Sequence, residues 1–200
     1  MIPFKNLEYD NVFITSDLHY CHKNLCRGTS VWPDKSVCRD FDTVEEMNET
    51  ILNNINTMVG KDDLLIINGD LSFGGEQNIP ELIYNINCVN LIATYGNHDH
   101  KVHNYANNFI MIDHILYLQV GMYKFVISHF PQMHWHMMDK GSIMLYGHLH
   151  GHKDSYLQQY SNMFRITDVG IDTNNLYPYN IKNIGKEMQH KITKERHDKA

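Results

Sequence analysis

Side chains that commonly bind metal ions recur along the first three quarters of this 200-residue chain, in five short groups. The groups are Ser16-Asp17-Leu18-His19, Asn68-Gly69-Asp70, Gly96-Asn97-His98-Asp99, Ser128-His129-Phe130-Pro131 and Gly147-His148-Leu149-His150. Imidazole mixed with carboxylate and amide oxygen suits Mn, Fe, Zn or Co, whereas an all-oxygen set would favour Mg or Ca. The sequence therefore predicts a metal site assembled from distant segments.

The spacing within the groups predicts that two cations are bound together. Asp17 and His19 lie two residues apart, so on an extended segment both side chains would face one cation. His148 and His150 repeat this spacing. Asp70 has two carboxylate oxygens and could bridge two cations.

Phosphate ester hydrolysis is the natural chemistry of such a pair. Two divalent ions about 3.5–4 Å apart can hold a hydroxide between them and clamp the oxygens of a phosphoryl group. Asn97 offers a neutral amide oxygen as a further ligand, and His98 stays free to donate a proton to the leaving oxygen. Asp99 either orients His98 or, as we favour, accepts hydrogen bonds from nearby backbone amides.

Each group follows a short apolar run that is typical of a buried strand. The runs are residues 11–15, 64–67, 91–94, 123–127 and 143–146. Thr43 and Glu46 form a capping box for a helix whose apolar positions repeat as far as Met58, before Gly60. A second helix is expected over residues 80–87.

Alternating strands and helices indicate an α/β fold. Ligands of such folds gather beyond the carboxyl ends of the strands, so five strand ends can converge on one site. Gly69, Gly96 and Gly147 fit this arrangement, because a backbone that turns sharply beside a ligand often needs unusual dihedral angles or close approach.

The five groups, in this order over residues 17–150, resemble the signature motifs of the calcineurin-like metallophosphoesterase superfamily. The resemblance implies an α/β fold that is a four-layer αββα sandwich with two central mixed β-sheets and a dinuclear centre at their strand ends. It also implies that His98 is the catalytic histidine. The ligand sets that it implies are Asp17, His19, Asp70 and His150 for one metal ion, and Asp70, Asn97, His129 and His148 for the other.

The chain departs from one branch of that superfamily. Members that act on phosphoproteins carry GDxxDRG, whereas Phe73 and Gly74 stand here in place of the second Asp and the Arg. We therefore do not expect phosphoprotein phosphatase activity. Residues 16–24 and 168–172 are similar to small phosphoesterases of bacteria and their phages.

Composition and charge limit the binding partners and the cellular location that we expect for this chain. A formal net charge of −6 and a pI near 6.1 argue against strong non-specific binding of nucleic acid. The four cysteines form no CxxC pair, so free thiols are expected. No apolar run approaches the roughly 18 residues of a membrane span, and the first residues do not resemble a secretory signal, so we expect a cytoplasmic protein.

Residues 1–185 are expected to form one metallophosphoesterase domain, and residues 186–200 a charged tail or helix.

Other residues have two interpretations. His22 could touch substrate phosphate, although loop histidines are more often exposed or hydrogen-bonded. Arg27 and Arg39 could each form a bidentate phosphate contact, but surface solvation is expected. Trp135 would either stack on a nucleobase or pack in the core.

The leading hypothesis is a hydrolase that uses two divalent metal ions, Mn²⁺ first, with Fe, Zn, Co or Ni as alternatives. Its partner would be a phosphate-ester small molecule or nucleotide, with a phosphodiester or nucleotide favoured and a metal-bridging hydroxide as the nucleophile. A phosphomonoesterase, a cyclic-nucleotide phosphodiesterase and a non-catalytic interaction protein on the same scaffold remain as alternatives.

Overall fold

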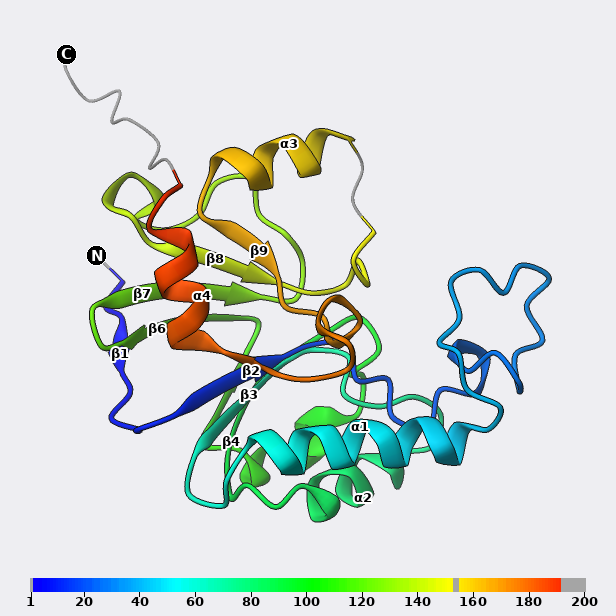
Figure 1. Ribbon diagram of the computed structural model, residues 1–200. Coiled ribbons are helices and arrows are strands. Elements are labelled where there is room, and N and C mark those ends of the chain that lie inside the picture. Colours follow the sequence, from blue (N-terminus) through cyan, green and yellow to red (C-terminus); the bar gives the residue numbers. More distant parts are fainter. Residues whose placement is uncertain (1, 153–154, 192–200) are drawn as a thin grey trace.

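Two β-sheets stacked face to face form the centre of the molecule (Figure 1). The computed structural model describes residues 2–152 and 155–191. One sheet has the strand order β10 (Tyr179–Asn180), β2 (Val12–Thr15), β3 (Leu64–Asn68), β4 (Asn90–Thr94) and β5 (Met111–Asp113). The other has the order β1 (Lys5–Asn6), β6 (Ile115–Val120), β7 (Tyr123–Ser128), β8 (Ile143–Tyr146) and β9 (Ile166–Asp168).

Both sheets are mixed. β10 pairs antiparallel with β2 and β6 pairs antiparallel with β7, while the other neighbours are parallel. The helices are α1 (Val44–Met58), α2 (Asn78–Asn85), α3 (Ser155–Met163) and α4 (Ile181–Met188). Short 3₁₀ segments are η1 (Lys23–Leu25), η2 (Val102–Asn108), η3 (Met138–Lys140) and η4 (Ile171–Asn174).

The alternation of side chains along the strands explains the layers. In β3, Leu64 and Ile66 point into the core between the sheets, and Leu65 and Ile67 point into the core beneath α1 and α2. In the other sheet, Val126 faces a third core that includes Leu157 of α3. Because both faces of the central strands β2, β3 and β8 are covered, these strands read as continuous apolar runs. The predicted four-layer αββα sandwich is confirmed.

All five predicted strands are present, with ends that differ by one residue at most. Helix α1 is also confirmed, because Thr43 Oγ1 accepts from the Glu46 amide at 3.2 Å. The second helix begins at Asn78, earlier than predicted, which keeps the following proline in the first turn. The four cysteines are free thiols, as expected.

The carboxyl-terminal region is organised around α4. This helix packs Ile181, Ile184 and Met188 into the core between the sheets and continues through residue 188. The predicted boundary at residue 186 therefore falls inside the helix, and residues 192–200 lie outside the described part of the chain. None of the helices in the described residues combines the length and apolar character needed to span a membrane.

The contact of α4 with β7 depends on a glycine. A Cβ atom added at Gly185 would lie 2.6 Å from the ring of Tyr123. We expect Gly185→Ala to lower the free energy of unfolding by about 1–3 kcal/mol, because the overlap forces the ring or the helix to move. Denaturant unfolding measures this loss. Asn183→Ala, an exposed change in the same helix, is the control, and an equal effect of both variants would contradict close packing at Gly185.

Candidate metal centre

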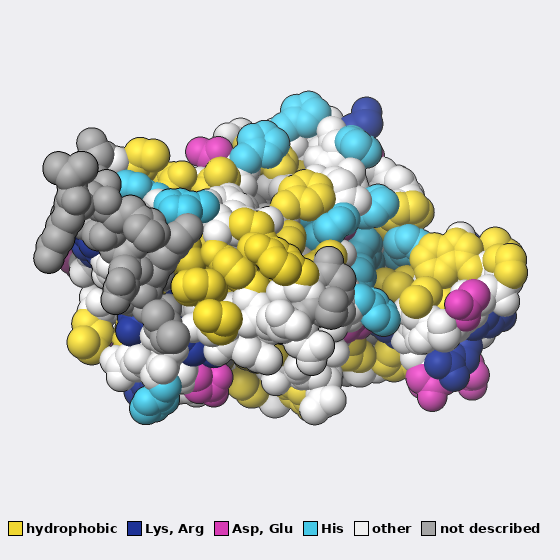
Figure 2. All heavy atoms as spheres, turned by 90° about the horizontal axis from the view of Figure 1, so that it is seen from above, with side chains coloured by type: hydrophobic (Ala, Val, Ile, Leu, Met, Phe, Trp, Pro, Cys, Tyr) yellow, Lys and Arg dark blue, Asp and Glu magenta, His cyan; other side chains and the backbone are white. Residues whose placement is uncertain are grey.

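The carboxyl ends of β2, β3, β4, β7 and β8 meet at one edge of the sandwich. Figure 2 shows histidine side chains gathered on this face, between the body of the molecule and the lobe formed by the loop that joins β2 to α1. The predicted convergence of distant motifs is therefore present in the structure.

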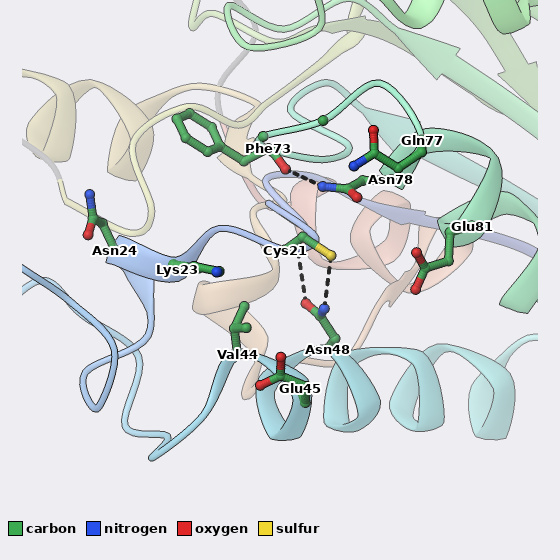
Figure 3. Close-up of a pocket in the computed structure, with 12 residues that line it drawn as sticks. Cys21, Lys23, Asn24, Val44, Glu45, Asn48, Phe73, Gln77, Asn78 and Glu81 are labelled. Atoms are coloured by element: carbon green, nitrogen blue, oxygen red, sulfur yellow. Dashed lines mark hydrogen bonds between the residues drawn. The ribbon is translucent and has the colours of Figure 1, made fainter.

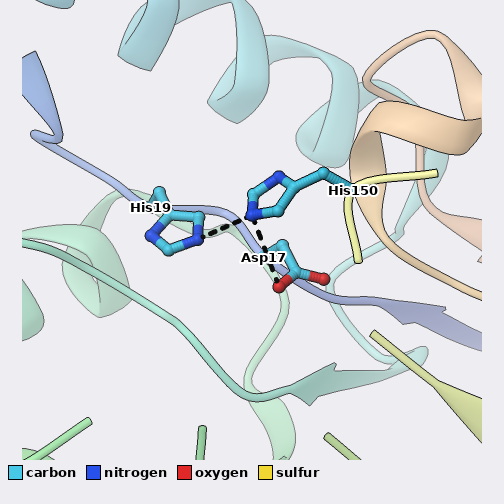
Figure 4. Close-up of side chains that lie close together, drawn as sticks. All are labelled: Asp17, His19 and His150. Atoms are coloured by element: carbon cyan, nitrogen blue, oxygen red, sulfur yellow. Dashed lines mark hydrogen bonds and ion pairs between the residues drawn. The ribbon is translucent and has the colours of Figure 1, made fainter. Parts of the chain in front are cut away.

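Asp17, His19 and His150 form the first triad of this centre (Figure 4). One ligand atom from each residue lies within 4.8 Å of the others. His19 Nε2 and His150 Nε2 are 3.2 Å apart, and His150 Nε2 lies 3.9 Å from Asp17 Oδ1. Two imidazole nitrogens and a carboxylate thus point at a common position.

Asp70, His129 and His148 form the second triad, again with ligand atoms within 4.8 Å of one another. Asn97 belongs to the same group, because its Oδ1 lies 3.0 Å from His129 Nε2 and 2.9 Å from His148 Nδ1. Asp70 Oδ2 lies 3.3 Å from His129 Nε2 and 3.5 Å from His19 Nε2. This carboxylate of the second triad therefore also faces the first, in the position where a ligand shared by two ions would lie.

The backbone conformation at these residues differs from the one that the sequence predicts. Asp17 and His19 have φ angles of 59° and 49°, and His148 and His150 have 71° and 49°. The expectation that each pair lies on an extended segment is wrong. Left-handed φ values are uncommon outside glycine and carry a cost of order 1–3 kcal/mol each, so the surrounding structure must hold these residues in place.

Close backbone packing supplies part of that support. The Asp17 amide donates to the Gly69 carbonyl at 3.1 Å, and the His148 amide donates to the carboxylate of Asp17 at 3.0 Å. A Cβ atom at Gly147 would lie 2.6 Å from Asp17 Oδ2, and one at Gly96 would overlap the carboxylate of Asp70. The predicted need for close approach is confirmed at these two glycines.

Asp99 ties two of the loops together. Its carboxylate accepts from the amides of Asp70 at 2.7 Å, Leu71 at 2.9 Å and Gly96 at 2.7 Å. The favoured prediction, that Asp99 accepts from backbone amides, is confirmed. The carboxylate anchors the loops after β3 and β4 to each other.

His98 lies at the exposed rim of the centre. Its amide donates to Asp70 Oδ1 at 2.9 Å, which fixes its backbone relative to the shared carboxylate. Its ring centroid lies 5.3 Å from that of His19 and 5.2 Å from that of Phe73. The ring is therefore beside the triads without being part of either.

Burial sets the charge of the ligands. It lowers the pKa of His19 to about 2, so this ring is neutral at pH 7 and its nitrogen lone pair is available. Burial raises the pKa of Asp17 to about 6. Burial alone would also raise the pKa of Asp70, but the hydrogen bond and charge of His129 hold it at about 2. Burial lowers the pKa of His129 and of His150, but the hydrogen bonds with Asp70 and Asp172 outweigh it and raise both pKa values, so a cation would have to displace protons from these two rings. Carboxylates together with deprotonated imidazoles and an amide oxygen fit divalent cations.

A hollow of about 340 Å³ opens over the centre. The ligand side chains form its floor, and Trp32, Phe73 and His98 stand in its walls. The centre is therefore accessible to a small molecule from the solvent side.

Comparison with known proteins agrees with this geometry. The family model of calcineurin-like phosphoesterases matches residues 11–184. The chain belongs to the calcineurin-like phosphoesterase family. Members of this family hydrolyse phosphate esters with divalent metal ions, so the two triads have the chemistry that the family requires.

Three known proteins are similar to this chain. An uncharacterized protein of Methanocaldococcus jannaschii, MJ1445, is 29% identical over 148 residues, which is 72% of this chain and 73% of that protein. The Gene 66 protein of Mycobacterium phage L5 is 27% identical over 175 residues, covering 70% of this chain and 77% of the phage protein. Protein AQ665 of Aquifex aeolicus, of unknown function, has a solved structure with a TM-score of 0.66 and 17% identity, covering 88% of this chain and 98% of that one. The last match supports the fold.

The carboxylate of Asp172 has a role at this centre that the five motifs do not predict. Asp172, in η4, accepts from His150 Nδ1 at 2.7 Å and so directs the opposite nitrogen of that ring into the first triad. Nothing in the spacing of the motifs pointed to this role, because Asp172 lies 22 residues beyond its partner. Burial would raise the pKa of Asp172, but Arg39 and His150 hold it well below its ordinary value.

Arg39 is buried, and the expectation that it is solvated at the surface is wrong. Its side chain is only 5% exposed, and its Nε and Nη2 atoms donate to the carboxylate of Asp172 at 2.7 and 2.9 Å. It also donates to the carbonyls of Asp17 at 2.6 Å and Leu18 at 2.8 Å. Arg39 is therefore neither solvated at the surface nor free to bind phosphate, since its donors hold the backbone of the first motif.

The remaining candidates have ordinary environments. Arg27 is exposed and pairs with Asp40 at 3.3 Å, as surface solvation predicts. Trp135 is buried and donates to the Ser142 carbonyl at 3.1 Å, so it packs in the core. His22 is buried, accepts from the amide at the end of η1 and lines the hollow over the metal centre.

We expect Asp172→Asn to weaken metal binding by about 10- to 100-fold, because His150 loses its charged orienting partner. Titration of the purified protein with Mn²⁺ measures this change. The variant also leaves Arg39 without its buried counter-ion, so denaturant unfolding of the metal-free protein should show a separate loss of stability.

Asp62→Asn is the control for this experiment, because Asp62 is an exposed aspartate outside the centre. Unchanged Mn²⁺ affinity in Asp172→Asn would contradict a role for this carboxylate in positioning His150.

Proposed function

We propose that this chain is a dinuclear metal-dependent phosphoesterase. The observation that carries the proposal is the position of Asp70, whose Oδ2 lies 3.5 Å from His19 in one triad and 3.3 Å from His129 in the other. A structural histidine cluster would not need a carboxylate shared between two sets of donors.

The ligand assignment follows the two groups. One divalent ion is held by Asp17, His19, Asp70 and His150, and the other by Asp70, Asn97, His129 and His148. Mn²⁺ is the proposed native ion, because it accepts this mixture of imidazole, carboxylate and amide oxygen. When bound, the two ions supply a hydroxide nucleophile at neutral pH and neutralise charge on the phosphoryl oxygens.

His98 is the proposed catalytic histidine. Its ring is exposed at the rim of the hollow, where a bound ester would place its leaving oxygen, and its backbone is fixed to Asp70 by a hydrogen bond of 2.9 Å. Donation of a proton from the imidazole to that oxygen would assist departure of the alcohol.

A phosphodiester or nucleotide is the favoured substrate. Phe73 and Gly74 occupy the positions of the Asp and Arg that characterise phosphoprotein phosphatases, and Phe73 instead forms an apolar wall of the hollow. An organic group on the phosphate would lie against that wall. The net charge of −6 disfavours non-specific binding to long nucleic acids.

Two substitutions separate the roles of ligand and acid. With Mn²⁺ added, we expect His98→Ala to lower kcat about 10²- to 10⁴-fold for a dinucleotide, whose alkoxide leaving group needs a proton, and by a smaller factor for the diester bis(4-nitrophenyl) phosphate. The variant should retain its metal ions, because the ring is not a ligand. Asp70→Asn should lose both hydrolysis and metal, since it removes charge from the shared carboxylate. His134→Ala, an exposed histidine in the loop after β7, is the control.

The outcomes discriminate among the alternatives. Faster turnover of 4-nitrophenyl phosphate than of the diester would show a phosphomonoesterase, and preferential turnover of a cyclic nucleotide would show a cyclic-nucleotide phosphodiesterase. Binding of two metal ions without hydrolysis of any of these esters would contradict the proposal and favour a non-catalytic interaction protein.

A further inference from the structure

A cavity of about 650 Å³ adjoins the metal centre (Figure 3). It lies between the loop after β2, the first turns of α1 and the start of α2, and we call it the α1–α2 cavity. Phe73 and Asn24 line both this cavity and the hollow over the metal centre, so the two spaces meet at these residues. Its volume is in the range of small-molecule sites.

Internal hydrogen bonds fix the walls of the cavity. Asn48 accepts from the Cys21 amide at 2.9 Å and donates to its thiol at 3.2 Å. The backbone carbonyl of Phe73 accepts from the Asn78 side chain at 2.7 Å, and the backbone amide of Phe73 donates to the Tyr20 carbonyl at 2.8 Å. Both backbone polar atoms of Phe73 are therefore hydrogen-bonded, which fixes the position from which its ring projects.

A row of aromatic rings connects the cavity with the metal centre. His22 stacks on Phe73 with ring centroids 3.8 Å apart, and Trp32 lies 5.8 Å beyond His22. Phe73, at the end of this row, is 37% exposed and lies at the junction of the two spaces. A planar group bound there would continue the stack, whereas a flexible chain or a small alkyl group would not use it.

The polar groups of the cavity suit an uncharged ligand that carries hydrogen-bond donors. Glu45 and Glu81 supply two carboxylates against the single ammonium group of Lys23, so a second phosphate would meet unfavourable charge. Gln77 and Asn24 add amides, which can both donate and accept. Nucleobases combine a planar ring with such donors and acceptors at the edge.

We propose that the α1–α2 cavity binds one nucleoside of a phosphodiester whose phosphate lies at the metal centre. The base lies on Phe73, and its polar edge faces the amides and carboxylates of α1 and α2. Phe73 is thus a specificity-determining residue, and the inference rests on the proposed function.

The test compares two esters with the same leaving group. Thymidine 5′-(4-nitrophenyl phosphate) carries a nucleoside, and methyl 4-nitrophenyl phosphate carries none, so the ratio of their kcat/KM values isolates recognition of the nucleoside. We expect Phe73→Leu to lower this ratio about tenfold or more, the loss expected from one base–aromatic stack. Phe73→Tyr, which retains the ring, should preserve it.

Tyr84→Leu is the matched control, because Tyr84 is an aromatic residue of α2 that is 89% exposed and outside the lining of both spaces. It should leave the ratio unchanged. A ratio that is the same in Phe73→Leu and the parent protein would overturn the inference while leaving phosphoester hydrolysis established.

A binding measurement distinguishes failure of the inference from failure of the proposed function. Trp32 lines the hollow and Trp135 is buried in another core, so tryptophan fluorescence should report occupancy near Phe73. We expect thymidine, which carries no phosphate, to change this signal saturably in metal-free protein, with weaker binding in Phe73→Leu. If neither ester is hydrolysed but this titration behaves as expected, the proposed function fails and the nucleoside site stands. If the titration shows no saturable change, the nucleoside site is wrong.

Discussion

The carboxylate and backbone of Asp70 connect the parts of this molecule that must act together. Its side chain lies between His19 and His129, and its second oxygen accepts from the amide of His98. Its own amide donates to Asp99, and its carbonyl accepts from the amide of His19 at 3.0 Å. One residue at the end of β3 thus fixes the relative positions of the loops after β2, β3, β4 and β7.

This arrangement combines left-handed backbone conformations with buried carboxylates, and both are unfavourable unless the surrounding structure stabilises them. Asp70 has a φ of 52°, in the left-handed region, like the two residue pairs of the first and last motifs. The nearby carboxylate of Asp17 is fully buried. Bringing these carboxylates together out of water is unfavourable without cations. Bound divalent cations would offset this charge and would thereby stabilise the fold at this edge. The two packed sheets supply the rigidity that holds these side chains on high-energy backbone conformations.

The strand ends, and the side chains that gather beyond them, could be predicted because both follow from local pattern. Apolar runs identified the buried strands, and the side chains just after residues 15, 94 and 146 had the chemistry of a metal site. The backbone conformation could not be predicted in this way, since two-residue spacing suits either an extended segment or alternating left-handed positions. The role of Arg39 also escaped, because its carboxylate partner Asp172 lies 133 residues away. Strand β6, whose side chains alternate between buried and half-buried, gave a weaker signal than the fully buried strands β3 and β8.

The account stands most directly on the presence of two cations that share one carboxylate. Anomalous diffraction from crystals grown with Mn²⁺, recorded near the manganese absorption edge, measures this without reference to any substrate. The account predicts two peaks, one within the Asp17 triad and one within the His129 triad, with Asp70 in contact with both. A single peak, or two peaks that Asp70 does not join, would contradict it.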